Sequence, residues 1–168
     1  MPFTILDISG AMEYQGSESA LMTASSERIP EGFYEAENMR KTVVPGRNLI
    51  FASILTGVAW SKKASKVLMG IHSGDHFIYP DCRPEFFKHM KCAIESGSGD
   101  LVTLEAPFLF GNKETILTYG YSIGVPFELT RTCYTAKEEA CGKCGSCQER
   151  LAAFERIGKY DPLLYRTG

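Results

Sequence analysis

The sequence has 168 residues, of which 44% are hydrophobic and 23% are charged, a composition typical of one globular domain rather than a disordered or fibrous chain. A chain of this size can bury a core without disulfides, and its net charge of −2 argues against a direct nucleic-acid partner, because such proteins usually carry a basic surface. No apolar run is long enough to span a bilayer, and the sequence opens without a basic, signal-like stretch, so we expect a cytoplasmic protein with no membrane partner.

The first third of the chain predicts one strand, a long irregular stretch and one helix. Residues 3–6 favour a strand, and residues 7–40 are rich in turn-forming residues and weakly periodic. Apolar residues then recur at helical spacing over residues 48–63, after the Pro45-Gly46 pair. This helix is expected to bury one broad face.

The rest of the chain alternates between predicted strands and helices. The apolar run 66–72 is typical of a strand buried on both faces of a parallel sheet. A second strand is predicted over residues 101–105. Helices are predicted over 83–96, 113–123 and 148–157, the second capped by Asn112 and ended by Gly124. This order indicates an α/β fold with a parallel sheet covered on both faces, in which ligands bind beyond the carboxyl ends of the strands.

Four of the six cysteines lie within fifteen residues of one another: Cys133, Cys141, Cys144 and Cys147. Tetrahedral zinc takes such a set of four thiolates, and a metal with all four positions filled by protein is structural rather than catalytic. The neighbouring Lys143 and Arg150 are expected to offset the negative charge of the site. Free cysteines and an iron–sulfur cluster are the alternatives.

Two further segments are candidate binding sites. Residues 72–86 place two histidines, two aspartates, a tyrosine, an arginine and a glutamate directly after a predicted buried strand, although a solvated loop or a His/Asp metal site would have the same composition. Arg47 and Asn48 open a predicted helix, where a guanidinium and backbone N–H groups can hold phosphate or carboxylate oxygens. The alternative there is an ordinary helix start.

Three ordered segments together resemble the 7-cyano-7-deazaguanine synthase family. They are Lys-Thr-Val-Val-Pro-Gly-Arg-Asn at 41–48, Gly-Asp-His-Phe-Ile-Tyr-Pro-Asp-Cys-Arg-Pro-Glu-Phe at 74–86, and the cysteine segment from Thr-Cys-Tyr at 132–134 to Arg150. The resemblance runs in order from about residue 5 to residue 165, which is nearly the whole chain.

The resemblance implies a three-layer, adenine nucleotide alpha hydrolase-like (Rossmann-like) α/β fold and a ligase of queuosine biosynthesis, a tRNA modification pathway. Such an enzyme converts 7-carboxy-7-deazaguanine and ammonia to the nitrile, with ATP and Mg²⁺ as co-substrate, and holds one structural zinc on the four cysteines. The resemblance places Arg47 and Asn48 near the nucleotide and assigns no catalytic residue. It places five residues of the 72–86 loop on the deazapurine: Asp75, Tyr79, Asp81, Arg83 and Glu85.

One family motif has no counterpart in these residues. Family members begin with a strand and a Ser-Gly-Gly-x-Asp-Ser loop that wraps the ATP pyrophosphate, and Ser9-Gly10 lacks the second glycine and the Asp-Ser pair. We therefore expect an N-terminally truncated single domain (residues 1–168), with an α/β part at 1–130 that includes the substrate loop and a zinc-binding segment at 131–168.

The missing motif leaves three functional hypotheses open. The first is a synthase. The second is a pseudoenzyme or split-enzyme half that binds zinc and a deazapurine or partner chain without ATP chemistry. The third is a zinc-stabilised interaction domain with no small-molecule role. Loss of a central strand would expose a sheet edge, so we expect a homo-oligomer or a complementary chain that carries the missing loop.

Overall fold

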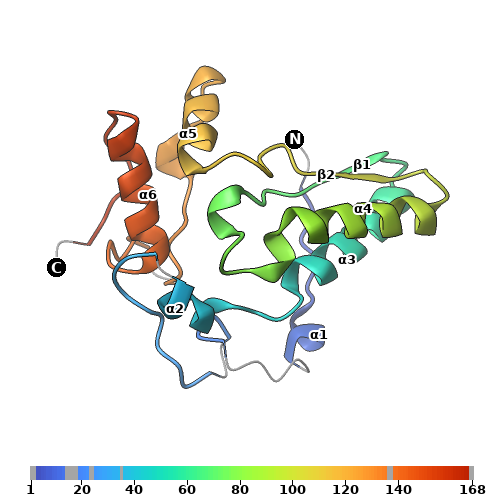
Figure 1. The fold of residues 1–168 in the computed structure, drawn as a ribbon, viewed down its shortest axis with the longest axis horizontal. Helices are drawn as coiled ribbons and strands as arrows, with labels where there is room; N and C mark the ends of the chain where they lie inside the picture. Colours follow the sequence, from blue (N-terminus) through green and yellow to red (C-terminus); the bar gives the residue numbers. More distant parts are fainter. Residues whose placement is uncertain (1–2, 14–18, 23–24, 35, 136–137, 167–168) are drawn as a thin grey trace.

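The computed structural model describes residues 3–13, 19–22, 25–34, 36–135 and 138–166. Two longer helices and two strands form one part of the molecule, seen on the right of Figure 1. The helices pack against each other and against the strands, and the strands pair in parallel, so the predicted α/β organisation with a parallel sheet is confirmed. These elements are α3 (Arg47–Ser61), β1 (Lys66–Leu68), α4 (Pro84–Ser98) and β2 (Thr103–Glu105).

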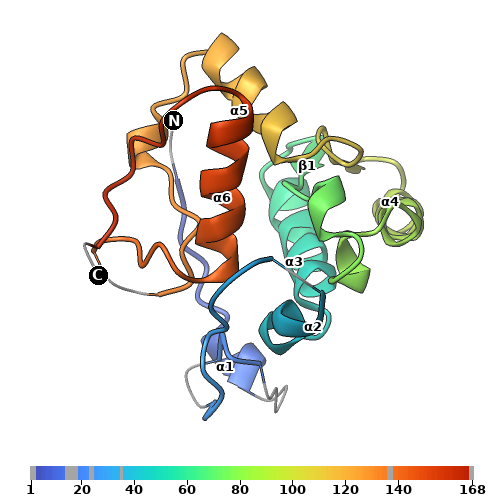
Figure 2. The same cartoon turned by 60° about the vertical axis from the view of Figure 1, so that its left-hand side comes forward.

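The second part of the molecule contains α5 (Lys113–Ser122) and α6 (Gly145–Arg156), which pack against each other. Leu117, Phe127, Ala153 and Phe154 form the buried core between them. Figure 2 shows α2 (Ala36–Met39) near the first turns of both α6 and α3. The remaining short elements are α1 (Ser9–Glu13) and four 3₁₀ turns, at Arg40–Thr42, Ser73–Asp75, Pro80–Cys82 and Phe127–Leu129.

The two-stranded sheet is covered on one face within the described residues. Val67 and Leu104 lie opposite each other in the register, are 5% and 0% exposed, and belong to the core that α3 and α4 complete. Leu68 on the other face is 62% exposed, and an ion pair from Lys66 Nζ to Glu105 Oε1 (2.7 Å) joins the two strands. The expectation of a strand buried on both faces is therefore wrong for this part of the chain.

Two expectations for the first third of the chain also differ from the structure. Residues 3–6 form no strand, and Phe3 and Ile5 are 86% and 82% exposed, because no described strand pairs with them. Helix α3 buries a narrow stripe containing Ala52 and Ala59 rather than a broad face. Its exposed apolar side chains are Leu49, Phe51, Leu55 and Trp60.

The helix ends follow the sequence signals closely. Pro84 opens α4, and the left-handed Gly99 (φ +60°) ends it. Asn112 caps α5 by accepting from the Thr115 N–H at 2.9 Å. Helix α6 begins at Gly145, three residues earlier than predicted, so it starts directly at the cysteine cluster. No helix in the described ranges is long and apolar enough to cross a membrane.

Candidate functional site

The four clustered cysteines form one potential metal centre. The sulfur atoms of Cys133, Cys141, Cys144 and Cys147 all lie within 4.8 Å of one another, and those of Cys141 and Cys147 are 4.0 Å apart. A tetrahedral zinc ion with Zn–S bonds of about 2.3 Å requires sulfurs roughly 3.8 Å apart. The predicted ligand set is therefore brought together with a spacing that fits a single ion.

The backbone around the cluster points N–H groups at the sulfurs. The left-handed Gly142 (φ +68°) makes the tight turn, so the N–H groups of Lys143 and Cys144 donate to Cys141 Sγ at 3.4 and 3.3 Å. Burial opposes ionisation of Cys133, but donation from the Cys141 N–H and the Thr135 hydroxyl lowers its pKa to about 6. These donors stabilise thiolate, the form that binds metal.

In the two most deeply buried thiols of the cluster, burial outweighs the hydrogen bonds that favour thiolate. It raises the pKa of Cys144 and of Cys147, and their mutual proximity raises that of Cys147 further. A bound cation favours the thiolate form of both. The N-terminus of α6 lies at the same place, and its positive end favours the negative charge of a metal–tetrathiolate centre.

Of the two basic residues expected to offset the negative charge of the cluster, only Lys143 lies where it can do so. Lys143 lines a pocket together with Cys141 and Cys144. Arg150 instead directs its guanidinium to Asp161, with Nε–Oδ2 at 2.6 Å and Nη2–Oδ1 at 2.8 Å. The expectation that Arg150 offsets the cluster is wrong, because a buried carboxylate already holds it.

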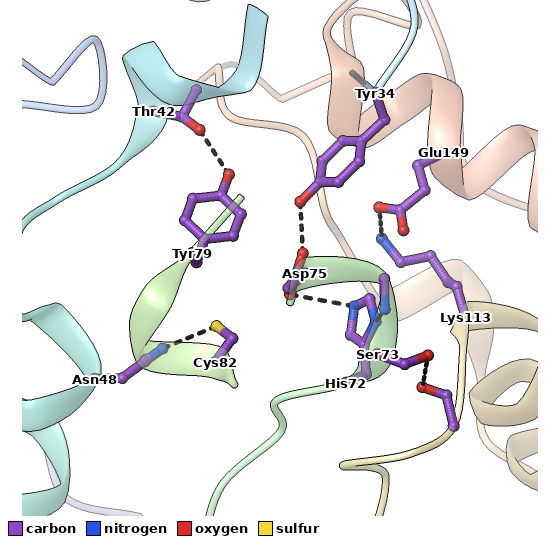
Figure 3. Close-up of polar contacts among 12 residues, drawn as sticks. Tyr34, Thr42, Asn48, His72, Ser73, Asp75, Tyr79, Cys82, Lys113 and Glu149 are labelled. Atoms are coloured by element: carbon purple, nitrogen blue, oxygen red, sulfur yellow. Dashed lines mark hydrogen bonds and ion pairs between the residues drawn. The ribbon is translucent and has the colours of Figure 1, made fainter. Parts of the chain in front are cut away.

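Asp75 lies at the centre of the polar loop and is held from two sides (Figure 3). The Tyr34 hydroxyl donates to Asp75 Oδ1 at 2.5 Å, and His72 Nε2 lies 3.4 Å from Oδ2. The Gly74 N–H donates to His72 Nδ1 at 3.2 Å, which orients the imidazole with Nε2 toward Asp75. Burial and the Asp75 charge raise the pKa of Tyr34 far above its usual range, which keeps it a donor.

Asn48 and Asp81 bind each other. Asp81 Oδ2 accepts from the Asn48 N–H at 2.9 Å and so caps α3, whose own N-cap residue is Gly46. The Asn48 amide donates to the Asp81 carbonyl and to Cys82 Sγ, both at 3.2 Å. Burial, followed by the Asp75 and Asp81 charges, raises the pKa of Cys82 to about 12. These contacts fix the loop against the start of α3.

A groove of about 260 Å³ opens at the carboxyl end of β1, where ligands bind in open α/β sheets. Arg47 lies in its wall, and its guanidinium forms no hydrogen bond or ion pair with a described residue, so it is available to a ligand. Phe51, Leu55 and Leu68 supply apolar wall surface. Asp75 and Cys82 lie in the wall formed by the polar loop.

The structure brings together some of the predicted ligand-binding residues and separates others. Arg47, Asn48 and Asp75 line this groove. Tyr79 is only 5% exposed, and its hydroxyl lies 2.6 Å from Thr42 Oγ1. Arg83 and Glu85 are exposed near the start of α4, outside the groove lining, and Arg83 Nε donates to the His76 carbonyl at 2.8 Å.

Sequence reasoning missed several residues that shape this site. His72 and Tyr134 lie inside the segments singled out above, so their position was a usable signal. Tyr34 lies in the irregular stretch, where nothing in the pattern distinguishes it. Lys113 and Glu149 form an ion pair of 2.5 Å between α5 and α6, beside the polar loop in Figure 3, and only the folded chain brings them together.

Comparison with known proteins agrees with the expected resemblance. The family described as Queuosine biosynthesis protein QueC matches residues 2–158. The chain is 48% identical over 161 residues to the 7-cyano-7-deazaguanine synthase of Pseudoalteromonas atlantica, covering 96% of this chain and 72% of that protein. It is 47% identical over 165 residues to the synthase of Caldicellulosiruptor saccharolyticus, covering 98% and 72%. The chain therefore belongs to the QueC family of queuosine biosynthesis proteins.

Proposed function

We propose that this chain acts as a 7-cyano-7-deazaguanine synthase, an ATP-dependent ligase that converts 7-carboxy-7-deazaguanine and ammonia into the nitrile. The observation that carries the proposal is the groove at the end of β1, where an unpaired Arg47 guanidinium and a fixed Asp75 carboxylate line one cavity. Its wider support is the similarity to synthases over nearly the whole chain. A cytoplasmic location remains a prediction.

The reaction needs a carboxylate oxygen, and later an amide oxygen, to be turned into leaving groups. In the first stage a carboxylate oxygen attacks a phosphorus atom of ATP and displaces the rest of its phosphate chain. Ammonia then adds to the carbon, loses a proton and expels that oxygen on phosphorus, which leaves the amide. In the second stage the amide oxygen is activated on phosphorus in the same way, and loss of the nitrogen's two protons expels it to give the nitrile. The protein must therefore hold phosphate oxygens and orient a planar base.

Arg47 and Asp75 suit these two tasks. The guanidinium of Arg47 would bind phosphate or carboxylate oxygens with its forked donors. Asp75 Oδ1 accepts a hydrogen bond from Tyr34, and Oδ2 faces His72. Each oxygen keeps a lone pair that can accept from the N–H donors of a guanine-like ring. We propose that Asn48, Tyr79 and Asp81 act behind this surface by holding the loop in position, and that Arg83 and Glu85 contact the substrate only from its exposed side.

The phosphate-binding loop is proposed to come from outside residues 1–168. These residues contain no Ser-Gly-Gly-x-Asp-Ser segment, while the sheet has an open face with Leu68 exposed and α3 presents Phe51 and Leu55 at the groove. A further strand and its helix would cover these apolar side chains and complete the three-layer adenine nucleotide alpha hydrolase-like fold. A chain segment that carries the phosphate loop fits this place better than a second copy of residues 1–168, which contain no such loop.

We propose that the four cysteines bind one zinc ion and that ATP binds with Mg²⁺. The sulfur spacing and the N–H donors around Cys133 and Cys141 support a single ion. With four thiolate ligands, such an ion has no open position, so it would supply structural stability and no Lewis-acid chemistry.

A single-turnover assay tests the enzyme proposal. The protein is incubated with ATP, Mg²⁺, ammonium and 7-carboxy-7-deazaguanine, alone and with a polypeptide that carries the phosphate loop, and products are read by mass spectrometry. Amide or nitrile is expected, and Asp75→Asn is expected to lower its yield while the exposed Glu128→Gln leaves it unchanged. Substrate binding without any product in either mixture would favour the second candidate, a binding protein without ATP chemistry.

A further inference from the structure

Three hydroxyl groups connect the cysteine cluster to the polar loop. The Tyr79 hydroxyl lies 2.6 Å from Thr42 Oγ1 and 3.3 Å from the Tyr134 hydroxyl. Thr42 and Tyr79 are 0% and 5% exposed, so these contacts lie away from competing water. The three residues come from three separate segments of the chain, and Tyr134 directly follows the metal-ligand candidate Cys133.

The chain of hydroxyls has a fixed direction. Thr42 Oγ1 lies 2.7 Å from the Met39 carbonyl, which can only accept, so the single Thr42 proton is used there. The Tyr79 hydroxyl must then donate to Thr42, and the Tyr134 hydroxyl must donate to Tyr79. The protons of these three hydroxyl groups are therefore all used within the protein, and none is left to donate to a ligand.

The start of α6 provides a second connection. Helix α6 follows Cys144 directly, and its Glu149 carboxylate binds Lys113. A Cβ atom added to Gly74 in the polar loop would lie 3.1 Å from Glu149 Oε1 and 3.0 Å from His72 Cε1. A shift of α6 would therefore change the packing around Gly74, the residue before Asp75. The cysteine segment thus lies beside Gly74 at the start of the 74–82 loop and contacts Tyr79 in its middle.

We propose that the metal-bound cysteine segment positions the 74–82 loop for substrate through Tyr134, which makes Tyr134 a positioning residue rather than a ligand of the substrate. The inference rests on the proposed function for the identity of the substrate, but the mechanical link does not depend on it. A metal fixes Cys133, Cys133 fixes the adjacent Tyr134, and Tyr134 holds Tyr79 in the orientation that Thr42 completes.

Hydrogen exchange of the loop amides measures this link directly. Tyr134→Phe removes the hydroxyl and keeps the ring, and Tyr160→Phe is the control because Tyr160 is 97% exposed. Exchange of the amides of Ile78, Tyr79, Asp81 and Cys82 is expected to accelerate about fivefold in Tyr134→Phe, the effect of one net hydrogen bond. The same acceleration is expected in wild-type protein stripped of metal with a chelator. Zinc content of Tyr134→Phe is expected to equal that of wild type, and the α5 amides should not change.

The same variants separate this inference from the proposed function. Unchanged loop exchange in Tyr134→Phe and in the stripped protein would overturn the link, whatever the protein binds. Calorimetry with 7-carboxy-7-deazaguanine in the absence of ATP gives the second measurement, in which Tyr134→Phe is expected to weaken binding about fivefold. Faster exchange with no binding by wild type would sustain the link and contradict the proposed substrate.

Discussion

The guanidinium of Arg150 and the carboxylate of Asp161 form a two-pronged ion pair that is almost fully buried, with side chains 4% and 1% exposed. The remaining Arg150 donors reach Thr130 Oγ1 at 2.8 Å and the Phe127 carbonyl at 3.1 Å. The Tyr165 hydroxyl donates to Asp161 Oδ2 at 2.5 Å. This network joins α6 to the segments before and after it, so the cysteine cluster depends on Arg150 for the position of its helix.

Replacing Asp161 by asparagine is expected to destabilise the protein by about 3–5 kcal/mol, because it leaves the buried Arg150 charge uncompensated. The matched control is Glu27→Gln, which breaks an exposed pair with Lys41 whose side chains are 58% (Lys41) and 43% (Glu27) exposed, and it should cost less than about 1 kcal/mol. Urea unfolding measures both. Equal losses in the two variants would contradict the importance of the buried pair.

The contribution of Asp161 should also depend on pH. Burial opposes its charge, but the hydrogen bonds from Arg150 and Tyr165 lower its pKa below the usual 3.8. A carboxyl whose pKa is lowered by folding stabilises the protein fully above its unfolded value and loses that contribution as pH falls through the folded one. The difference in unfolding free energy between wild type and Asp161→Asn should be constant from neutral pH down to about pH 5 and shrink below about 3.8. A difference that grows in acid would show that another group controls it.

Gly74→Ala tests how closely the polar loop is packed. The added Cβ would meet His72 Cε1 at 3.0 Å, and because His72 is 6% exposed it has little room to move. We expect a loss of stability of about 1–3 kcal/mol and weaker substrate binding, since His72 contacts Asp75. In Gly97→Ala, nothing lies within 4 Å of the new atom, and the alanine should stabilise α4 by about 0.5–1 kcal/mol. Thermal unfolding and calorimetric titration distinguish the two.

Metal analysis tests the cysteine cluster. Freshly purified protein is expected to hold one zinc ion per chain, and Cys147→Ser should lose most of it and several kcal/mol of stability, because Cys147 is fully buried. Cys92→Ser changes an exposed cysteine outside the cluster and should alter neither quantity. Elemental analysis and thermal unfolding give the result. Iron in place of zinc, or full metal content in Cys147→Ser, would contradict the assignment.

Local signals in the sequence predicted most of the helices, because caps and breakers act within a few residues. Pro84 and Asn112 mark helix starts that the structure reproduces, whereas the helix predicted to end at residue 96 continues to Ser98. The cysteine spacing predicted the cluster for the same reason, since a short turn at Gly142 determines it. Burial was predicted less well. Leu68 and Phe51 have apolar side chains in apolar runs, yet both are exposed. Burial depends on whether segments far away in the sequence pack over a residue, and a local pattern does not show this.

The polar loop shows the same division between local and distant causes. The sequence placed Asp75 at the end of a strand, and Asp75 does line the groove there. It gave no means to see that Tyr34, forty-one positions away, donates to Asp75, or that Asp81 is used to cap α3. Composition predicts that a loop is polar, and only tertiary contacts decide which of its polar groups remain free for a ligand.

The cysteine segment forms isolated β-bridges with residues that precede and follow it in the sequence: Glu31 pairs with Cys144, and Ala140 pairs with Tyr165. During synthesis, the cluster therefore cannot reach its final form when Cys147 emerges from the ribosome. It must wait until residues 161–166 have followed and docked onto it. The packing around the cluster is thus completed only after residues 161–166 have been synthesised.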